Sequence, residues 1–137
     1  MMAYIAGPLF NEKEREFLHE INSICRAIGI DTYLPAQDGG LLCNDNADEV
    51  FETDIRALNK ASLVVASLNG VDVDSGTAFE LGYGFAKGKK LFGLHTDSRV
   101  FTPSSEVNLM MLKSCTICHS LHELDTTLRE HYEAEKL

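Results

Sequence analysis

We predict an α/β fold from the sequence: a doubly wound, five-stranded parallel sheet with helices on both faces. Strand-like apolar segments alternate with segments whose apolar residues recur at helical spacing, which indicates parallel strands joined by crossover helices. The segment SLVVASL (62–68) is apolar nearly throughout, as a central strand covered on both faces should be. At 137 residues the chain has the length of one domain, so we expect residues 1–137 to form a single domain of the flavodoxin or Rossmann-like kind.

The elements of the first half follow from local signals. The predicted order is a strand at 3–7, a helix from Asn11 to Gly29, a strand at 30–35, a loop at 36–45, a helix from Ala47 to Lys60, and a strand at 62–68. The turn Gly7-Pro8 ends the first strand. Asn11 and Glu14 match a capping box, and Gly29 closes that helix. The next helix carries one apolar stripe, made of Ala47, Val50, Phe51 and Leu58.

The second half repeats the alternation. The predicted order is a helix at 75–87, a strand at 90–95, a loop containing Pro103, a short helix near 105–113, a strand at 115–119 and a polar closing helix at 120–135. Ligands of such sheets bind beyond the carboxyl ends of the strands. We therefore expect the functional residues near these four segments: 7–8, 35–40, 69–77 and 95–103.

Glu80 is an unusual residue for its position, because it lies inside a largely apolar helical pattern. Residues three and four positions away share its helix face: Gly76, Thr77, Tyr83 and Gly84. The opposite face is the expected packing face: Ala78, Leu81, Phe85 and Ala86. Glycine inside a helix costs about 1 kcal/mol relative to alanine, so two glycines beside one acid suggest that space is needed there. The alternative is a first-turn glutamate that the helix N-terminus stabilises.

Asp54 is the second unusual carboxylate. It follows Val50 and Phe51 by four and three residues and precedes Leu58 by four, so it lies in line with the apolar stripe. A carboxylate on a core face is costly unless it is paired or used in function. The alternative is an aspartate at the edge of the stripe that reaches solvent.

Metal-binding patterns are incomplete. Asp72 and Asp74 in NGVDVDSG are typical of turns, and although alternate acids suit Ca²⁺, the twelve-residue EF-hand pattern is absent. The segment CTICH (115–119) matches the haem-attachment pattern and, with His119 and His122, offers a possible zinc set. Buried strand thiols explain its cysteines better. We expect no metal.

Patterns for cofactors and for a catalytic triad are also incomplete. No G-x-G-x-x-G follows the first strand, and no G-x-x-x-x-G-K-[ST] occurs. His95 and Ser98 lack the G-x-S-x-G elbow that would support a triad. We expect no cofactor.

The net charge of −9 argues against a nucleic-acid partner, which requires a Lys/Arg surface, and fits a neutral or weakly charged small ligand. The same charge could serve solubility alone. The N-terminal MMAYIAGPLF has no basic region and no long apolar run, so we expect neither a secretory signal nor a membrane span, and a cytoplasmic location. The four cysteines, Cys25, Cys43, Cys115 and Cys118, are expected to be reduced thiols.

Four segments together resemble the nucleoside 2-deoxyribosyltransferase family: YIAGPLF, ETDIRALNKASLVVASLNG, DVDSGTAFELGYGFAKGK and EVNLMM. The resemblance covers roughly residues 3 to 118, and the stretch 38–48 departs from the family pattern. It implies transfer of a deoxyribosyl group from a 2′-deoxynucleoside to a free nucleobase. Glu80 would be the nucleophile, and two inversions through a covalent glycosyl-enzyme would give net retention.

The resemblance also implies roles for other residues. Asp54 would help protonate the leaving base, Tyr4 would orient Glu80, and Asp74 would bind sugar hydroxyls. Gln37 would read the base edge. The remaining expected substrate-binding residues are Gly7, Gly76, which leaves room for the sugar, and Asn108 and Met110, which would reach a neighbouring subunit's site. This last role implies a homo-oligomer.

Two alternatives stay open. One is a 2′-deoxynucleoside 5′-monophosphate N-glycosidase of the same fold, with water as acceptor. It would need phosphate-binding groups where this chain has Asp72 and Asp74. The other is a non-catalytic nucleoside sensor, because fold alone does not fix function.

Overall fold

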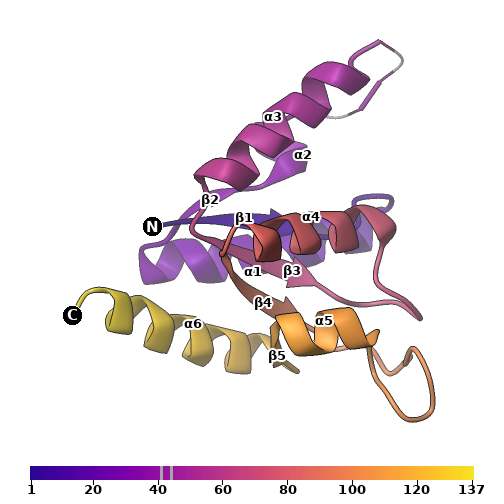
Figure 1. The fold of residues 1–137 in the computed structure, drawn as a ribbon, viewed down its shortest axis with the longest axis vertical. Helices are drawn as coiled ribbons and strands as arrows, with labels where there is room; N and C mark the ends of the chain where they lie inside the picture. Colours follow the sequence, from indigo (N-terminus) through magenta and orange to yellow (C-terminus); the bar gives the residue numbers. More distant parts are fainter. Residues whose placement is uncertain (41, 44) are drawn as a thin grey trace.

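The computed structural model describes residues 1–40, 42–43 and 45–137 of the chain. In this part of the chain, a single sheet of five parallel strands has the order β2-β1-β3-β4-β5, which confirms the predicted fold class (Figure 1). The strands are β1 (Met2–Ala6), β2 (Asp31–Tyr33), β3 (Leu63–Ser67), β4 (Lys90–Leu94) and β5 (Thr116–Cys118). The strand order reverses between β1 and β3, so the loops after these two strands diverge at the carboxyl edge and leave room for a site.

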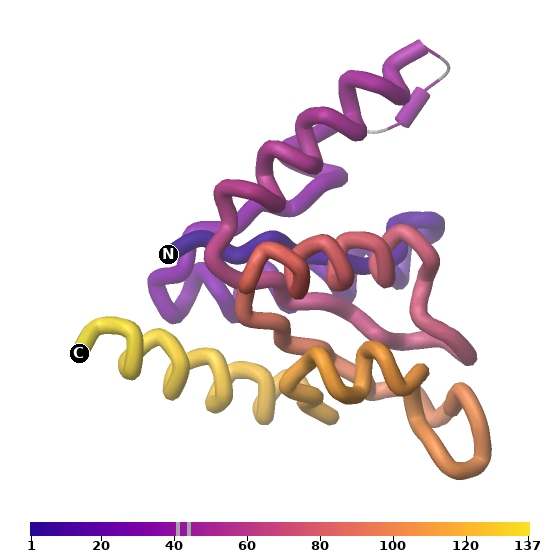
Figure 2. The backbone as a smooth tube through the Cα atoms, viewed as in Figure 1, coloured from indigo at the N-terminus to yellow at the C-terminus, as the bar shows by residue number. Residues whose placement is uncertain are grey.

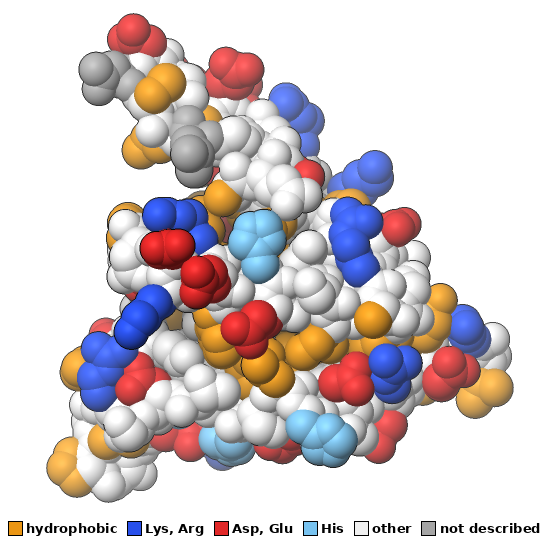
Figure 3. Space-filling model, turned by 180° about the vertical axis from the view of Figure 1, so that it is seen from behind, with side chains coloured by type: hydrophobic (Ala, Val, Ile, Leu, Met, Phe, Trp, Pro, Cys, Tyr) orange, Lys and Arg blue, Asp and Glu red, His pale blue; other side chains and the backbone are white. Residues whose placement is uncertain are grey.

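Helices cover both faces of the sheet (Figures 1 and 2). On one face α1 (Glu12–Ile28) and α6 (Leu121–Glu135) bury residues such as Ile5, Val65 and Phe92. On the other face α3 (Ala47–Lys60), α4 (Ser75–Ala86) and α5 (Leu109–Ser114) pack on alternate strand residues, such as Tyr4 and Val64. Seen from the side of α1, charged side chains of both signs surround a narrow hydrophobic band (Figure 3).

The capping box at Asn11 and Glu14 is present, and Gly29 ends α1 with a φ of 106°, a conformation that favours glycine. The expected loop at 36–45 is partly wrong, because α2 (Pro35–Asp38) forms within it. Pro35 occupies the first helical position, and the Asp38 carboxylate accepts a hydrogen bond from the Leu34 amide at 2.7 Å. Residues 41 and 44 of that loop, and of the divergent stretch 38–48, lie outside the described residues.

The short helix expected near 105–113 begins later, at Leu109. An isolated bridge joins Thr102 to Ser105, and the Asn108 side chain caps the helix by accepting from the Met110 amide. The residues before Asn108 therefore form a turn instead of the first helical turn.

The faces of α4 differ from the prediction. Thr77 and Gly84 are buried against the sheet, whereas Phe85, expected on the packing face, is 63% exposed. The reason is close approach: a Cβ on Gly84 would lie 3.0 Å from Val64 Cγ2 and 3.1 Å from a Leu91 methyl. Gly84 serves helix–sheet packing and does not leave space for a ligand.

Candidate active site

Two adjoining cavities lie at the carboxyl edge of the sheet. The smaller has a volume of about 220 Å³ and is lined by Phe51, Asp54, Ile55, Leu58, Asp74, Gly76, Phe79 and Glu80. The larger has a volume of about 440 Å³ and is lined by Gly7, Pro8, Leu9, Phe10, Pro35, Gly40, Leu42, Val50, Asp54 and Asp74. Asp54 and Asp74 border both cavities, so the acids singled out from the sequence meet in one place.

Glu80 lies in the second turn of α4, so it is not the first-turn glutamate of the alternative interpretation. Its Oε2 accepts a hydrogen bond from the hydroxyl of Tyr4, a fully buried residue of β1. Burial raises the pKa of Glu80 to about 7; the Tyr4 bond opposes this rise, and the nearby charges of Asp54 and Asp74 add to it. Burial also raises the pKa of Tyr4, so its hydroxyl remains a donor.

Asp54 projects from α3 and is half-buried. Its Oδ1 accepts a hydrogen bond from the Tyr33 hydroxyl at 2.8 Å. Burial raises the pKa of Asp54, and the Tyr33 bond opposes that rise because it favours the ionised form. The carboxylate is thus paired, as the costly position on the helix stripe required.

Tyr33 is a site residue that the sequence reasoning missed. It ends β2 beside Tyr4 in the parallel register, and the two rings stack with centroids 5.4 Å apart. The available signal was a tyrosine at a strand end near 35–40, but the pairing that brings it to Asp54 is a long-range feature. The result is two tyrosine–carboxylate pairs side by side.

Asp74 caps the N-terminus of α4. Its Oδ2 accepts from the amide and the hydroxyl of Thr77, both at 3.0 Å. A Cβ on Gly76 would lie 3.3 Å from that same oxygen, so glycine leaves this side of the cavity open. The turn-forming role expected for loop acids is therefore compatible with a binding role through Oδ1.

The loop that carries Asp74 is tied to the loop after β4. Asn69 Oδ1 accepts from the amides of Thr96 and Asp97 at 2.8 and 3.2 Å. Asp97 accepts from the Gly70 amide at 3.0 Å and from Arg99 Nε at 2.9 Å. These bonds, together called the loop clasp, hold the segment that leads into α4.

Two further predicted residues differ in their placement. Gly7 lines the larger cavity, and a Cβ there would lie 2.5 Å from Leu18 Cδ2, so glycine at this position serves packing against α1. Gln37 is exposed on α2, although its neighbours Pro35 and Gly40 line the cavity. A role for Gln37 in reading a base stays a prediction.

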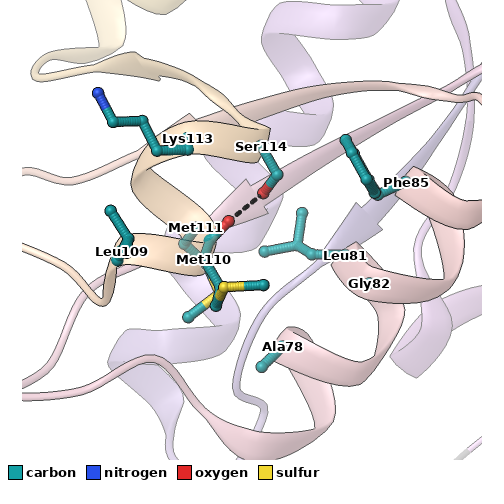
Figure 4. Close-up of a pocket in the computed structure, with 9 residues that line it drawn as sticks. All are labelled: Ala78, Leu81, Gly82, Phe85, Leu109, Met110, Met111, Lys113 and Ser114. Carbon is teal, nitrogen blue, oxygen red and sulfur yellow. Dashed lines mark hydrogen bonds between the residues drawn. The ribbon is translucent and has the colours of Figure 1, made fainter.

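Asn108 and Met110 lie apart from Glu80, on the other side of α4. Met110 is 72% exposed and borders an apolar groove of about 350 Å³ between α4 and α5. The groove is lined by Ala78, Leu81, Gly82, Phe85, Leu109, Met110, Met111, Lys113 and Ser114 (Figure 4). Within one chain these residues do not join the two cavities.

The described residues contain no group of three His, Cys, Asp or Glu side chains placed to hold a metal ion. In the CTICH segment, Cys118 is buried in the core and His119 Nε2 lies 2.9 Å from a Glu106 carboxylate oxygen. The four cysteines are all described and form no disulfide. Among the helices described, none combines the length and the apolar character needed to cross a bilayer.

A doubly wound sheet with paired, partly buried carboxylates in a cavity at its carboxyl edge is typical of enzymes that act on small molecules. A family model described as nucleoside 2-deoxyribosyltransferase matches residues 3–128. The chain therefore belongs to the nucleoside 2-deoxyribosyltransferase family, whose members act on nucleosides and nucleobases.

Individual relatives agree with this membership. An uncharacterized Schizosaccharomyces pombe protein is 32% identical over 108 residues, which are 72% of this chain and 51% of that protein. The chain thus spans about half the length of this curated relative.

Solved structures share the fold at low identity. A 2-deoxyribosyltransferase of Bacillus psychrosaccharolyticus is similar with a TM-score of 0.77 and 21% identity, over 91% of this chain and 90% of that one. A 2-deoxyribosyltransferase of Leishmania mexicana has a TM-score of 0.76 and 22% identity, over 95% and 97%. A CMP N-glycosidase of Clostridium botulinum has a TM-score of 0.59 and 19% identity, over 93% and 98%.

Proposed function

We propose that this protein transfers a 2-deoxyribosyl group from a 2′-deoxynucleoside to a free nucleobase, through a covalent intermediate on Glu80 and with net retention. The observation that carries the proposal is the Tyr4–Glu80 pair, set in a cavity that Asp54 and Asp74 also line. Family membership supports the class of substrate.

In the first step a Glu80 oxygen forms a bond to C1′ on the face opposite the base, and the C1′–N bond breaks. The electron pair of that bond goes to the base nitrogen, and Asp54 supplies the proton that the departing base needs. A second base then attacks C1′ from the vacated side, returns its proton to Asp54 and releases Glu80. Two inversions at one carbon give net retention.

The surroundings of each group suit its proposed role. Tyr4 holds one oxygen of Glu80, which orients the nucleophile. Burial raises the pKa of Asp54, which favours the protonated form that a proton donor requires. The larger cavity has apolar walls from Phe10, Pro35 and Leu42, which suit a planar base.

We also propose that the sites are completed by a neighbouring subunit. Asn108 and Met110 would supply the 5′-hydroxyl contact and a wall of the base site of that neighbour. The exposure of Met110 and Phe85 beside an apolar groove supports a contact surface on α4 and α5. The net charge of −9 disfavours nucleic acid as a partner.

A second candidate is a nucleotide N-glycosidase with water as acceptor. One observation favours it: a cavity of about 410 Å³ next to Asp74 is bordered by Lys13 and Arg99, which could attract a phosphate. Asp72, Asp74 and Asp97 line the same cavity and oppose a dianion there. We therefore rank transfer between nucleosides first.

The test is a pair of assays on the purified protein. Deoxyinosine or thymidine is incubated with adenine, and deoxyadenosine is sought by chromatography; its formation is the expected result. Deoxyadenosine and its 5′-monophosphate are then supplied in parallel without acceptor. Rapid hydrolysis of the monophosphate alone would favour the second candidate, and no reaction with any donor would favour a nucleoside sensor.

A further inference from the structure

Tyr33 forms a hydrogen bond with Asp54, the proposed proton donor. Its hydroxyl donates to Asp54 Oδ1 at 2.8 Å, and its ring stacks on Tyr4 at an interplanar angle of 21°. The register between β1 and β2 sets Tyr4 and Tyr33 opposite each other. The hydrogen bond therefore connects β2, through Tyr33, to the Asp54 carboxylate on α3.

Gly39 packs directly over this bond. A Cβ on Gly39 would overlap the Tyr33 hydroxyl, and would lie 2.8 Å from Asp54 Oδ1 and 3.1 Å from the Pro35 carbonyl oxygen. Any side chain at position 39 would therefore displace the Tyr33 hydroxyl. The short helix α2 brings Gly39 to this place, and a hydrogen bond from the Leu34 amide to the Asp38 carboxylate stabilises that helix.

We propose that Tyr33, with Gly39 packed over it, is a positioning residue that fixes the Asp54 carboxyl so that Oδ2 faces the departing base. This inference rests on the proposed function. Without the bond, a carboxyl on a helix surface can rotate, and only some orientations would direct a proton at the leaving nitrogen.

The same bond also controls when Asp54 carries a proton. The titratable groups facing the pair are Tyr4 of β1, Asp38 of α2, and Asp74 and Glu80 at α4. The pKa of Asp54 is already raised by burial, and the Tyr33 hydroxyl is the group that opposes the rise. Removing the hydroxyl should therefore raise the pKa of Asp54 further.

The test compares two donors in Tyr33→Phe, which keeps the ring and its stacking on Tyr4. With deoxyinosine, whose base must be protonated as it leaves, we expect kcat to fall about 10- to 100-fold. With 7-methyl-2′-deoxyguanosine, whose base is already cationic, we expect a change of less than about threefold. Asp54→Asn gives the reference pattern for a site without the proton donor.

Gly39→Ala should reproduce the Tyr33→Phe pattern, because the new methyl group displaces the hydroxyl. Tyr83→Phe is the matched control: the Tyr83 hydroxyl on α4 donates to Asn59 on α3 at 2.7 Å, away from the two cavities, so the rates with both nucleosides should stay unchanged. A titration of Asp54 by carbon NMR on labelled protein should show a higher pKa in Tyr33→Phe than in the wild type.

The outcomes separate the two proposals. If the wild type cleaves neither donor, the proposed function is wrong. If the wild type is active and Tyr33→Phe slows both donors equally, or leaves the pKa of Asp54 unchanged, then Tyr33 has only a structural role and this inference is overturned.

Discussion

Glu80 and Asp54 are both partly buried carboxylates that accept a hydrogen bond from a tyrosine hydroxyl, yet their surroundings differ. Glu80 is held by a fully buried tyrosine and lies near two other acids, and its pKa rises to about 7. Asp54 is half-buried, and the Tyr33 bond counteracts the effect of burial on its pKa. The nucleophilic role proposed for Glu80 requires its ionised form, which predominates above about pH 7 and which the Tyr4 hydrogen bond favours.

Removing the nucleophile gives the sharpest prediction for a single residue. Glu80→Ala should lower the rate of base exchange by at least ~10³-fold, because the covalent route is lost. Glu130→Ala, which removes an exposed glutamate of α6, is the control and should retain full activity. Exchange by Glu80→Ala at a rate near that of the wild type would contradict the assignment.

Glu80 should also make stability depend on pH. Its folded pKa of about 7 exceeds the ordinary value of 4.5, so the folded state binds more protons between these values. The free energy of unfolding should therefore fall as pH rises from about 4.5 through about 7.

Glu80→Gln removes this dependence. Urea denaturation should show the variant to be more stable than the wild type at pH 8, by on the order of 2 kcal/mol, with the gain vanishing near pH 4.5. A gain that stays equal at both pH values would show that ionisation of Glu80 is not its source.

At the scale of elements, two features position the site: the loop clasp after β3 and β4, and the close packing of α4 on the sheet. The clasp matters because Asp74 borders both cavities and caps the N-terminus of α4. Gly84 matters because it sets how closely α4, and with it Glu80, approaches β3 and β4. Each feature can be tested with a matched pair of substitutions.

Asp97→Ala should disrupt the clasp. The side chain of Asp97 is 13% exposed, and bonds from Arg99 and Gly70 hold its pKa far below the usual range. We expect a loss of about 1–3 kcal/mol in stability at pH 7, together with a higher KM for the nucleoside. The stability loss should shrink as pH falls below about 3.8, where protonation weakens the same bonds in the wild type.

Asp125→Ala is the control for Asp97→Ala, since Asp125 pairs with Arg129 on the more exposed surface of α6. Its loss should be about 0.5 kcal/mol or less, with KM unchanged. Equal effects of the two variants, measured by denaturation and initial rates, would argue against a positioning role for the clasp.

Two glycines of α4 should respond oppositely to alanine. A Cβ on Gly82 meets nothing within 4 Å, so Gly82→Ala should stabilise the protein by about 0.5–1 kcal/mol through helix propensity. A Cβ on Gly84 would press on the Val64 and Leu91 side chains. Gly84→Ala should therefore have a melting temperature below that of Gly82→Ala, and the reverse order would refute the packing argument.

At the level of the whole molecule, the groove between α4 and α5 suggests a contact with another subunit (Figure 4). Large apolar side chains beside it are exposed in the single chain. Asn108 and Met110 lie beside it, apart from the Glu80 cavity of the same chain. If neighbouring subunits share sites, variants that damage different halves of the site must complement each other.

Glu80→Ala and Asn108→Ala, each nearly inactive alone, should regain activity when mixed under conditions that allow subunits to exchange. A dimer of one subunit of each kind has one site with both residues intact, so about a quarter of wild-type activity is expected from equal amounts. If the mixture shows only the summed activities of the two separate variants, Asn108 acts within its own chain. Wild-type mixtures treated identically give the reference.

The sequence predicted the strand–helix order and the edge of the sheet where the acids gather. These features depend on local periodicity and on a general rule for parallel sheets, so they can be read without knowing any contact. The role of Gly29 as a helix end is equally local, whereas for Asp74 the sequence predicted a turn and the structure shows that it also caps α4. The faces of α4 and the start of α5 were wrong, because close packing at Gly84 and capping at Asn108 overrode the simple pattern.

The fold class, the family resemblance of the motifs and the set of candidate acids all follow from the order of amino acids along the chain. The hydroxyl donors that meet those acids follow from the folded arrangement: Tyr4 with Glu80, and Tyr33 with Asp54 beneath Gly39. A hydrogen bond between residues 76 positions apart depends on strand register and helix packing, and neither quantity is encoded in any short stretch of chain.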